Sequence, residues 1–84
     1  MTVHASHPAI INRLKRAHGH LAGIIEMMSA ERSCTELAQQ LQAVEGAIKS
    51  AKKALIHEHI NDCLAHGDDA TKVAEEFRAI AKFL

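Results

Sequence analysis

Apolar residues recur along this chain at three- and four-residue steps, in three stretches separated by short polar connections. That spacing is the period of an α-helix, on which residues three and four apart share a face. No stretch carries the alternating pattern of a strand, and no internal repeat or linker divides the sequence. The pattern predicts an all-α fold in which residues 1–84 form a single domain of three helices.

The first helix is expected to begin near Ser6 and Pro8, because serine is a favoured N-cap and proline fits the first turn. Residues 1–7 are expected to be flexible. Gly19 and Gly23 lie inside this helix, where each costs about 1 kcal/mol relative to alanine. We interpret them as positions that a second helix approaches closely, although tolerated small residues would leave the same pattern. The apolar positions of this helix are Ile10, Leu14, Ala17, Leu21, Ile24 and Met28.

The second helix is the longest predicted element. The letters SCTE at residues 33–36 match a capping box, with Ser33 at the N-cap and Glu36 three residues later. No proline interrupts the chain before Gly67, which has the character of a residue that follows a helix end. A helix of about 32 residues spans about 48 Å. Its apolar positions recur at heptad-like spacing: Leu37, Leu41, Val44, Ile48, Ala51 and Leu55.

A short third helix is expected after the polar stretch that contains Gly67. Asp68 or Asp69 can cap its start, because aspartate is a favoured N-cap residue. Its apolar residues form one stripe: Val73, Phe77, Ile80 and Leu84.

Composition fits small, closely packed helices. The 84 residues include no Trp, no Tyr and two Phe, so the core must be aliphatic. A chain of this size buries little surface by itself, which favours an oligomer. No apolar run approaches the ~18–20 residues of a membrane span, and the start lacks the regions of a signal peptide. We therefore expect a cytoplasmic protein, whose two cysteines are thiols rather than a disulfide.

Charge is balanced overall but unevenly distributed. Ten basic and ten acidic residues cancel, so net charge gives no sign of nucleic-acid binding. Taken alone, runs of basic residues are ordinarily solvated helix faces, and the alternative is a surface for DNA phosphates. Six of the ten basic residues fall in two runs, which are Arg13, Lys15 and Arg16 and then Lys49, Lys52 and Lys53.

The candidate chemistry lies in HEHINDC at residues 57–63 and in one distant cysteine. His59 and Cys63 are four residues apart and share a helical face. Cys34 is in the first turn of the same helix, about 37 Å away, so one chain cannot bring it to His59 without breaking the helix. Two chains can do so if their long helices pair antiparallel about an axis near residues 47 and 48. Such an isologous pair would hold the site twice.

Two thiolates and an imidazole form a soft donor set that suits Cu(I). With a further nitrogen or water ligand the same residues could hold Ni(II), Co(II) or Zn(II). Two structural cysteines and an unrelated histidine would give the same letters. An enzyme or redox switch with Cys34 or Cys63 as nucleophile ranks low, because the chain offers no Ser/His/Asp order, phosphate loop or acid pair. A metal-storage protein or metallochaperone without a DNA role is a further alternative.

Three segments together resemble the copper-sensing repressor family, the CsoR/RcnR-like group of small all-helical bacterial regulators. They are RLKRAHGHLAGIIEMM, SCTELAQQLQAVEGAI and HEHINDC. Cysteine, then 24 residues, then His-x-x-x-Cys is the copper-type ligand set of that family, here Cys34, His59 and Cys63. The resemblance implies an antiparallel homodimer that pairs into a disc-shaped homotetramer. It also implies a repressor that leaves its operator DNA, and so derepresses an efflux or resistance operon, when an inducer binds at this site.

The resemblance also implies roles for residues outside the ligand set. Both basic runs, from Arg13 to Arg16 and from Lys49 to Lys53, become the DNA-binding surface. Glu76 aligns with a glutamate of the third helix that completes the outer shell of the metal. Ser33 departs from the pattern, because copper sensors often carry tyrosine there.

Cu(I) is the predicted inducer, and Ni(II) or Co(II) is the alternative. Nickel and cobalt members add an N-terminal histidine ligand, and although that slot falls near Thr2, His4 and His7 are close. A thiol- or aldehyde-responsive repressor is a further alternative. Cys63 argues against a formaldehyde sensor, in which an acidic residue replaces it, and His59 argues against a persulfide sensor, which lacks it.

Overall fold

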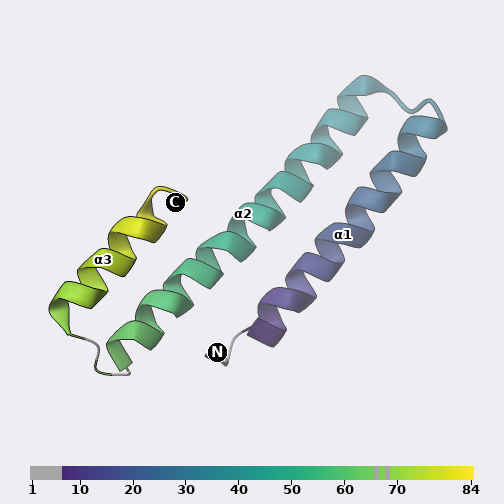
Figure 1. The fold of residues 1–84 in the computed structure, drawn as a ribbon. Helices are drawn as coiled ribbons and strands as arrows, with labels where there is room; N and C mark the ends of the chain where they lie inside the picture. Colours follow the sequence, from purple (N-terminus) through teal and green to yellow (C-terminus); the bar gives the residue numbers. More distant parts are fainter. Residues whose placement is uncertain (1–6, 66, 68) are drawn as a thin grey trace.

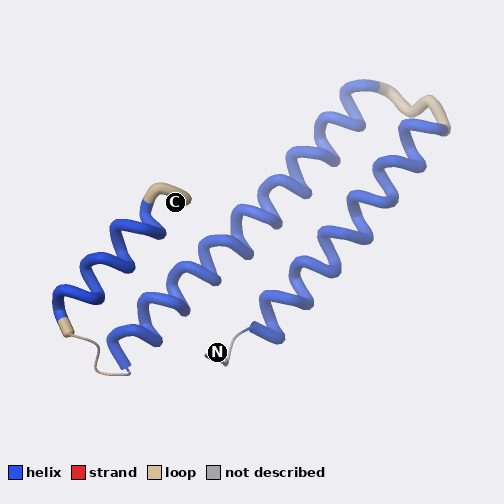
Figure 2. Tube along the Cα trace, in the orientation of Figure 1, coloured by secondary structure: helices blue, strands red, loops and turns tan. Residues whose placement is uncertain are grey.

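The computed structural model describes residues 7–65, 67 and 69–84, which contain three helices (Figure 1). Helix α1 is His7–Ser29, α2 is Cys34–Ala65 and α3 is Ala70–Ala81. None of the described residues forms a strand (Figure 2). α1 runs antiparallel along one side of α2, and α3 runs antiparallel along the other side of its C-terminal half. The predicted all-α fold with one long central helix is confirmed.

The three helices form a flat, elongated arrangement. Its principal extents are 55 × 23 × 15 Å. The shortest extent is close to the diameter of one helix with its side chains, about 10–12 Å, so the chain is a single layer. A single layer leaves both of its faces open to solvent. Among the described residues, no helix is long and apolar enough to cross a membrane.

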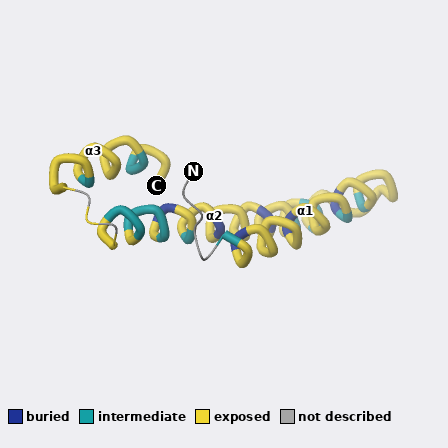
Figure 3. The backbone as a smooth tube through the Cα atoms, turned by 60° about the horizontal axis from the view of Figure 1, so that its bottom comes forward, coloured by how far each residue is buried: buried dark blue, intermediate teal, exposed yellow. Residues whose placement is uncertain are grey.

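The core lies along the seam between α1 and α2 (Figure 3). Ile10, Ala17 and Ile24 of α1 are seven residues apart and buried, and Val44 and Ala51 of α2 repeat the same step. Seven residues make almost two helical turns, so each set forms a straight line along its helix. None of the residues of α3 is fully buried, which makes α3 the more weakly packed element.

A second line of large apolar residues runs beside this core but is open to solvent. Each of its side chains is between 38% and 58% exposed. Within each helix these positions are seven residues apart, and Leu14 of α1 lines one hollow together with Ile48 and Leu55 of α2. We refer to this surface as the open stripe, and its members are Leu14, Leu21 and Met28 of α1 with Leu41, Ile48 and Leu55 of α2.

The end of α1 is a Schellman turn without glycine. The Arg32 N–H donates to the Met27 carbonyl and the Glu31 N–H donates to the Met28 carbonyl, both at 3.2 Å. This pattern requires a left-handed residue after the helix, and glycine is preferred there because it has no Cβ. Glu31 takes this position with a φ of 59°.

The start of α2 confirms half of the predicted capping box. The Ser33 hydroxyl accepts a hydrogen bond from the Glu36 N–H at 3.2 Å, so Ser33 is the N-cap. The Glu36 carboxylate instead accepts from Arg32 Nη2 at 2.6 Å, which differs from the return contact to Ser33 that a capping box requires. Both contacts lie where the α1–α2 connection meets Cys34, the first residue of α2.

The connection from α2 to α3 follows the predicted turn chemistry. Gly67 has a φ of 70°, and its N–H donates to the Leu64 carbonyl at 3.3 Å. The Asp69 carboxylate caps α3 by accepting from the Lys72 N–H at 2.8 Å. Asp68, the alternative cap, lies outside the described residues. Leu84 was expected to complete the helical stripe of α3, but it follows the last helical residue, Ala81, because the chain turns at 82 and 83.

The expectation for Gly19 and Gly23 is wrong within one chain. A Cβ atom added at either position would meet nothing within 4 Å. α1 packs on α2 through the face of Ile10, Ala17 and Ile24, and both glycines lie on other sides of the helix. Ser6, the expected N-cap of this helix, lies outside the described residues.

Candidate metal centre

His59 and Cys63 lie side by side near the C-terminal end of α2. One helical turn separates them, and the Cys63 Sγ is 3.9 Å from His59 Nε2. Both residues are half-buried, which places them at the boundary between packed side chains and solvent. Cysteine and histidine in this relation are a common pair of ligands for a soft or borderline metal ion.

Glu76 approaches this pair from α3. Its Oε2 atom is 2.9 Å from His59 Nε2, and the two side chains form an ion pair when the imidazole is protonated. The structure therefore brings together three residues singled out from the sequence: His59, Cys63 and Glu76. A carboxylate beside a ligating histidine fixes the orientation of the ring, and such outer contacts tune metal affinity.

Cys34 is not part of this group. It is the first residue of α2 and is exposed, and 25 residues of continuous helix separate it from His59. At about 1.5 Å per residue that separation is about 37 Å. Among the described residues, no three His, Cys, Asp or Glu side chains are grouped to hold a metal ion. One chain thus presents two neighbouring soft donors at one end of α2 and a third at the other end.

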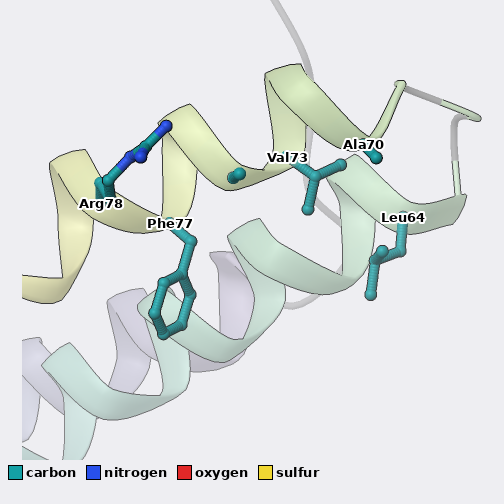
Figure 4. Close-up of a pocket in the computed structure, with 6 residues that line it drawn as sticks. Leu64, Ala70, Val73, Phe77 and Arg78 are labelled. Atoms are coloured by element: carbon teal, nitrogen blue, oxygen red, sulfur yellow. The ribbon is translucent and has the colours of Figure 1, made fainter.

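An apolar groove of about 620 Å³ lies next to the site, between the end of α2 and α3 (Figure 4). Phe77 points from α3 toward α2, whereas Arg78 extends along the outside of α3. Val73 and Leu64 also line the groove. The side chains that line the groove are not of the kinds that bind a soft metal ion, so the groove adds no candidate ligand.

The other histidines are distributed over the molecule. His20 of α1 is hydrogen-bonded through Nε2 to the Gln40 side chain of α2, which makes it a contact between helices. His57 is exposed. His7 is the first residue of α1, although it is also the last residue of the 1–7 stretch that we expected to be flexible. His4 lies outside the described residues.

The basic runs lie on separate helices. Arg13, Lys15 and Arg16 are exposed along α1. Lys49, Lys52 and Lys53 are exposed in the middle of α2, and all three line one small cavity beside the end of the chain. Lys52 also lines a hollow of about 200 Å³ with apolar residues of α1 and α2.

Residues 6–83 match the model of the metal-sensitive transcriptional repressor family. The chain belongs to this family. The resemblance found in the three sequence segments is thereby confirmed, and the family is one of repressors rather than enzymes.

The curated relatives include proteins named copper-sensing transcriptional repressor CsoR. The protein of Mycobacterium ulcerans (strain Agy99) is 39% identical over 57 residues, which cover 68% of this chain and 49% of that protein. That of Bacillus subtilis (strain 168) is 36% identical over 75 residues, or 89% of this chain and 71% of that protein. The match to the mycobacterial protein thus spans about half of its length.

A solved structure has the same fold. The nickel-responsive transcriptional regulator InrS aligns with a TM-score of 0.75 and 26% sequence identity, covering 98% of this chain and 92% of that one. Copper and nickel thus both occur in the names of the proteins that this chain resembles.

Proposed function

We propose that the protein is a metal-responsive transcriptional repressor, which binds operator DNA when metal-free and is released when Cu(I) binds between two subunits. Release would derepress an efflux or resistance operon. One observation carries this proposal: two soft donors, His59 and Cys63, lie together at one end of a continuous helix, and the third, Cys34, lies at the other end.

The open stripe supports an antiparallel pair of chains. Leu41, Ile48 and Leu55 run along α2 between the two ends that carry the donors, and each is at least 41% exposed. Large apolar side chains in a row are covered in a stable protein, most simply by the same surface of a second copy. Centred near Ile48, an antiparallel pairing would set Cys34 of each chain beside His59 and Cys63 of the other. We further propose that two such dimers pair into a disc-shaped tetramer.

The donor set fits Cu(I). Two thiolates and one imidazole satisfy a soft ion of low coordination number, whereas Ni(II) or Co(II) calls for further nitrogen or oxygen ligands. Cys34, His59 and Cys63 would hold the ion, and Glu76 would orient the imidazole. The bound metal would act as a link that joins two subunits, and the protein performs no reaction on it.

Nickel or cobalt is the second candidate inducer, favoured by the likeness to the nickel-responsive InrS. The extra ligand would be His4 or His7. Replacing both with alanine should leave Cu(I) affinity within about twofold if copper is the inducer, because neither belongs to the soft donor set. A large loss of metal-induced release in this variant would shift the assignment to nickel. A thiol- or aldehyde-responsive repressor predicts release by those compounds in metal-free solution.

We assign DNA binding to the basic runs of α1 and α2. Lysine and arginine side chains that neutralise phosphates release counterions, so the affinity falls as salt rises, with a slope of about 0.9 per phosphate contact. Arg13, Lys49 and Lys53 are exposed and would meet the DNA backbone.

The decisive experiment is a salt titration of binding to the promoter fragment upstream of the protein's own gene. Replacing Arg13, Lys49 and Lys53 with alanine should weaken binding to all DNA and flatten the salt dependence. Lys72→Ala, compared with each of the three alanine replacements made singly, is the matched control, because it removes one positive charge of α3 that we do not assign to the DNA surface. If the unmodified protein shows no salt-dependent binding to this fragment, the repressor function is wrong.

A further inference from the structure

Four side chains lie on one line along α2, and their spacing is the same from either end. Glu45 follows Cys34 by eleven residues, Lys52 comes seven residues later, and Cys63 comes eleven after that. Eleven residues make about three turns of an α-helix and seven make about two, so all four side chains share a face. The midpoint lies just after Ile48. An antiparallel second copy that sets Cys34 beside Cys63 of the partner subunit therefore also sets Glu45 beside Lys52 of the partner subunit.

Both charges lie at the edge of the open stripe. Glu45 and Lys52 line one hollow of about 270 Å³ on α2, together with Ile48 and Lys49. Lys52 also lines the hollow of about 200 Å³ to which three members of the open stripe contribute, whereas Lys49 and Lys53 do not. Lys52 thus differs from the other two lysines of its run, because it faces the surface that a second chain is proposed to cover.

Neither Glu45 nor Lys52 forms an ion pair within the part of the chain that the structure describes. Both side chains are exposed. Lys49 follows Glu45 by four residues, which is the spacing of an intrahelical ion pair, but the two side chains do not form one. A charge at the edge of a covered apolar surface loses contact with water, and an opposite charge on the covering chain offsets that loss.

The open stripe by itself does not select one register. Leu41, Ile48 and Leu55 recur every seven residues, so a partner shifted by seven residues still meets apolar side chains. The charges differ between these registers. A shift in one direction brings Glu45 against Glu45 of the partner subunit, and a shift in the other brings Lys52 against Lys52 of the partner subunit. Like charges at a covered surface disfavour both alternatives.

We propose that Glu45 pairs with Lys52 of the partner subunit, and Lys52 with Glu45 of the partner subunit, and that these two ion pairs select the register in which the metal ligands meet. This inference rests on the shared centre proposed above and names the residues that choose the partner and its alignment. It also assigns Lys52 to the contact between subunits and removes it from the DNA-binding surface, where Lys49 and Lys53 remain.

The test reverses each charge in a separate variant, Glu45→Lys and Lys52→Glu. Either variant alone places like charges at both contacts of its dimer. Its dissociation constant, measured by sedimentation equilibrium at low salt, should therefore rise roughly fivefold to fiftyfold. In about 1 M salt the difference should shrink, because screening then acts over about 3 Å. Tight Cu(I) binding, measured against a chelator, should be lost at protein concentrations where the variants are monomeric.

Refolding the two variants together should restore the pairing. One chain then carries positive charge at both positions and the other negative charge, so a mixed dimer has opposite charges at both contacts. With one variant labelled with ¹⁵N, native mass spectrometry should show mixed dimers in clear excess over random pairing. Tight Cu(I) binding should return to within about twofold of the unmodified protein. Glu75→Lys and Lys72→Glu are the matched controls, because they reverse exposed charges of α3 away from this face and should change neither value.

The double variant Glu45→Lys/Lys52→Glu exchanges the two charges within one chain and should form homodimers again. Circular dichroism verifies that each variant folds, and the double variant keeps the test valid if a single one does not. Failure of the double variant to dimerise, random pairing in the mixture, or single variants that dimerise like the unmodified protein would overturn the proposal. If the unmodified protein is still a dimer with tight Cu(I) sites, only the charge pairing fails. If the unmodified protein is a monomer, the shared centre fails as well.

Discussion

Glu31 adopts a positive φ, the only non-glycine residue to do so in the described part of the chain. Its φ of 59° is required by the turn that ends α1, in which its N–H and that of Arg32 bond to carbonyls of the last helical turn. A Cβ atom makes this region unfavourable by roughly 1–2 kcal/mol. Glu31→Gly should therefore raise the free energy of unfolding, by about 0.5–1 kcal/mol after allowing for the greater freedom of glycine in the unfolded chain.

Urea denaturation would measure this change, and Glu31→Ala is the control. Alanine removes the carboxylate but keeps the Cβ atom, so it should leave the conformational cost in place. If glycine and alanine gave the same stability, the cost of this turn would not arise from the backbone of Glu31.

His59 is the proposed ligand that has a direct contact with α3. Its Nε2 atom is 2.9 Å from Glu76 Oε2, so ring orientation and the position of α3 depend on each other. His59→Ala should retain metal through the two proposed thiolates but lose most of the metal-induced release of DNA, because allosteric coupling requires a contact that differs between the two states.

Metal affinity and DNA release would be measured on the same preparation. His57→Ala is the matched control, since His57 is exposed and two residues away, on another side of the helix. Release of the His59→Ala variant at the same Cu(I) concentration as the unmodified protein would contradict coupling through Glu76.

At the scale of elements, local signals predicted the helices well. Ser33 caps α2 and Asp69 caps α3, because a short side-chain acceptor can reach the unpaired N–H groups of a first turn wherever the chain allows it. Gly67 marks the turn after α2 for the same local reason. These features depend on three or four neighbouring residues, which the sequence shows directly.

Contacts between distant elements were less predictable. Gly19 gave no indication of which side of α1 meets α2, since that depends on the whole apolar face. Leu84 continued the stripe of α3 by spacing but lies beyond the helix, next to the lysine run. The spacing of Lys49, Lys53 and Ile56 indicates that these side chains share a face, but only the structure shows that Ile56 is buried there while both lysines are exposed. The contact of His59 with Glu76 followed from family resemblance and not from spacing.

The N-cap of α3 provides an element-scale prediction. The Asp69 carboxylate accepts from the Lys72 N–H at 2.8 Å, and α3 has no fully buried residue to compensate for its loss. Asp69→Ala should weaken the cap by about 1 kcal/mol. The amide hydrogens of α3 should then exchange about fivefold faster, while those of α1 and α2 change little. Asp69→Asn, which keeps a capping oxygen, should restore slow exchange, and equal protection of α3 in the alanine variant would show that the cap contributes nothing.

At the scale of the whole molecule, one chain leaves apolar surface and the candidate ligand Cys34 exposed. A layer about as thick as a single helix exposes the open stripe, and the proposed donors lie at opposite ends of α2, with Cys34 at the start and His59 and Cys63 near the end. The antiparallel partner proposed above would cover the stripe and would bring the donors together. The proposed pairing is argued from the length of α2, which keeps Cys34 away from His59 within one chain. It can therefore be tested without reference to any relative.

The test mixes two variants of the chain, one with Cys34→Ala and one with Cys63→Ala. Each variant alone should form dimers in which both sites lack a ligand. In a mixed dimer, one site inherits both defects. The other combines Cys34 from the Cys63→Ala chain with His59 and Cys63 from the Cys34→Ala chain, and is fully native.

Refolding the two variants together should therefore restore tight Cu(I) binding at one site per mixed dimer, whereas neither variant alone regains it. The measurement is a competition titration against a Cu(I) chelator, with the content of mixed dimers established by native mass spectrometry. A site held within one chain could not be rescued in this way, because every chain keeps its own defect. Mixed dimers without a tight site would thus rule out the shared centre, and with it the proposal that the metal acts by drawing the ends of two long helices together.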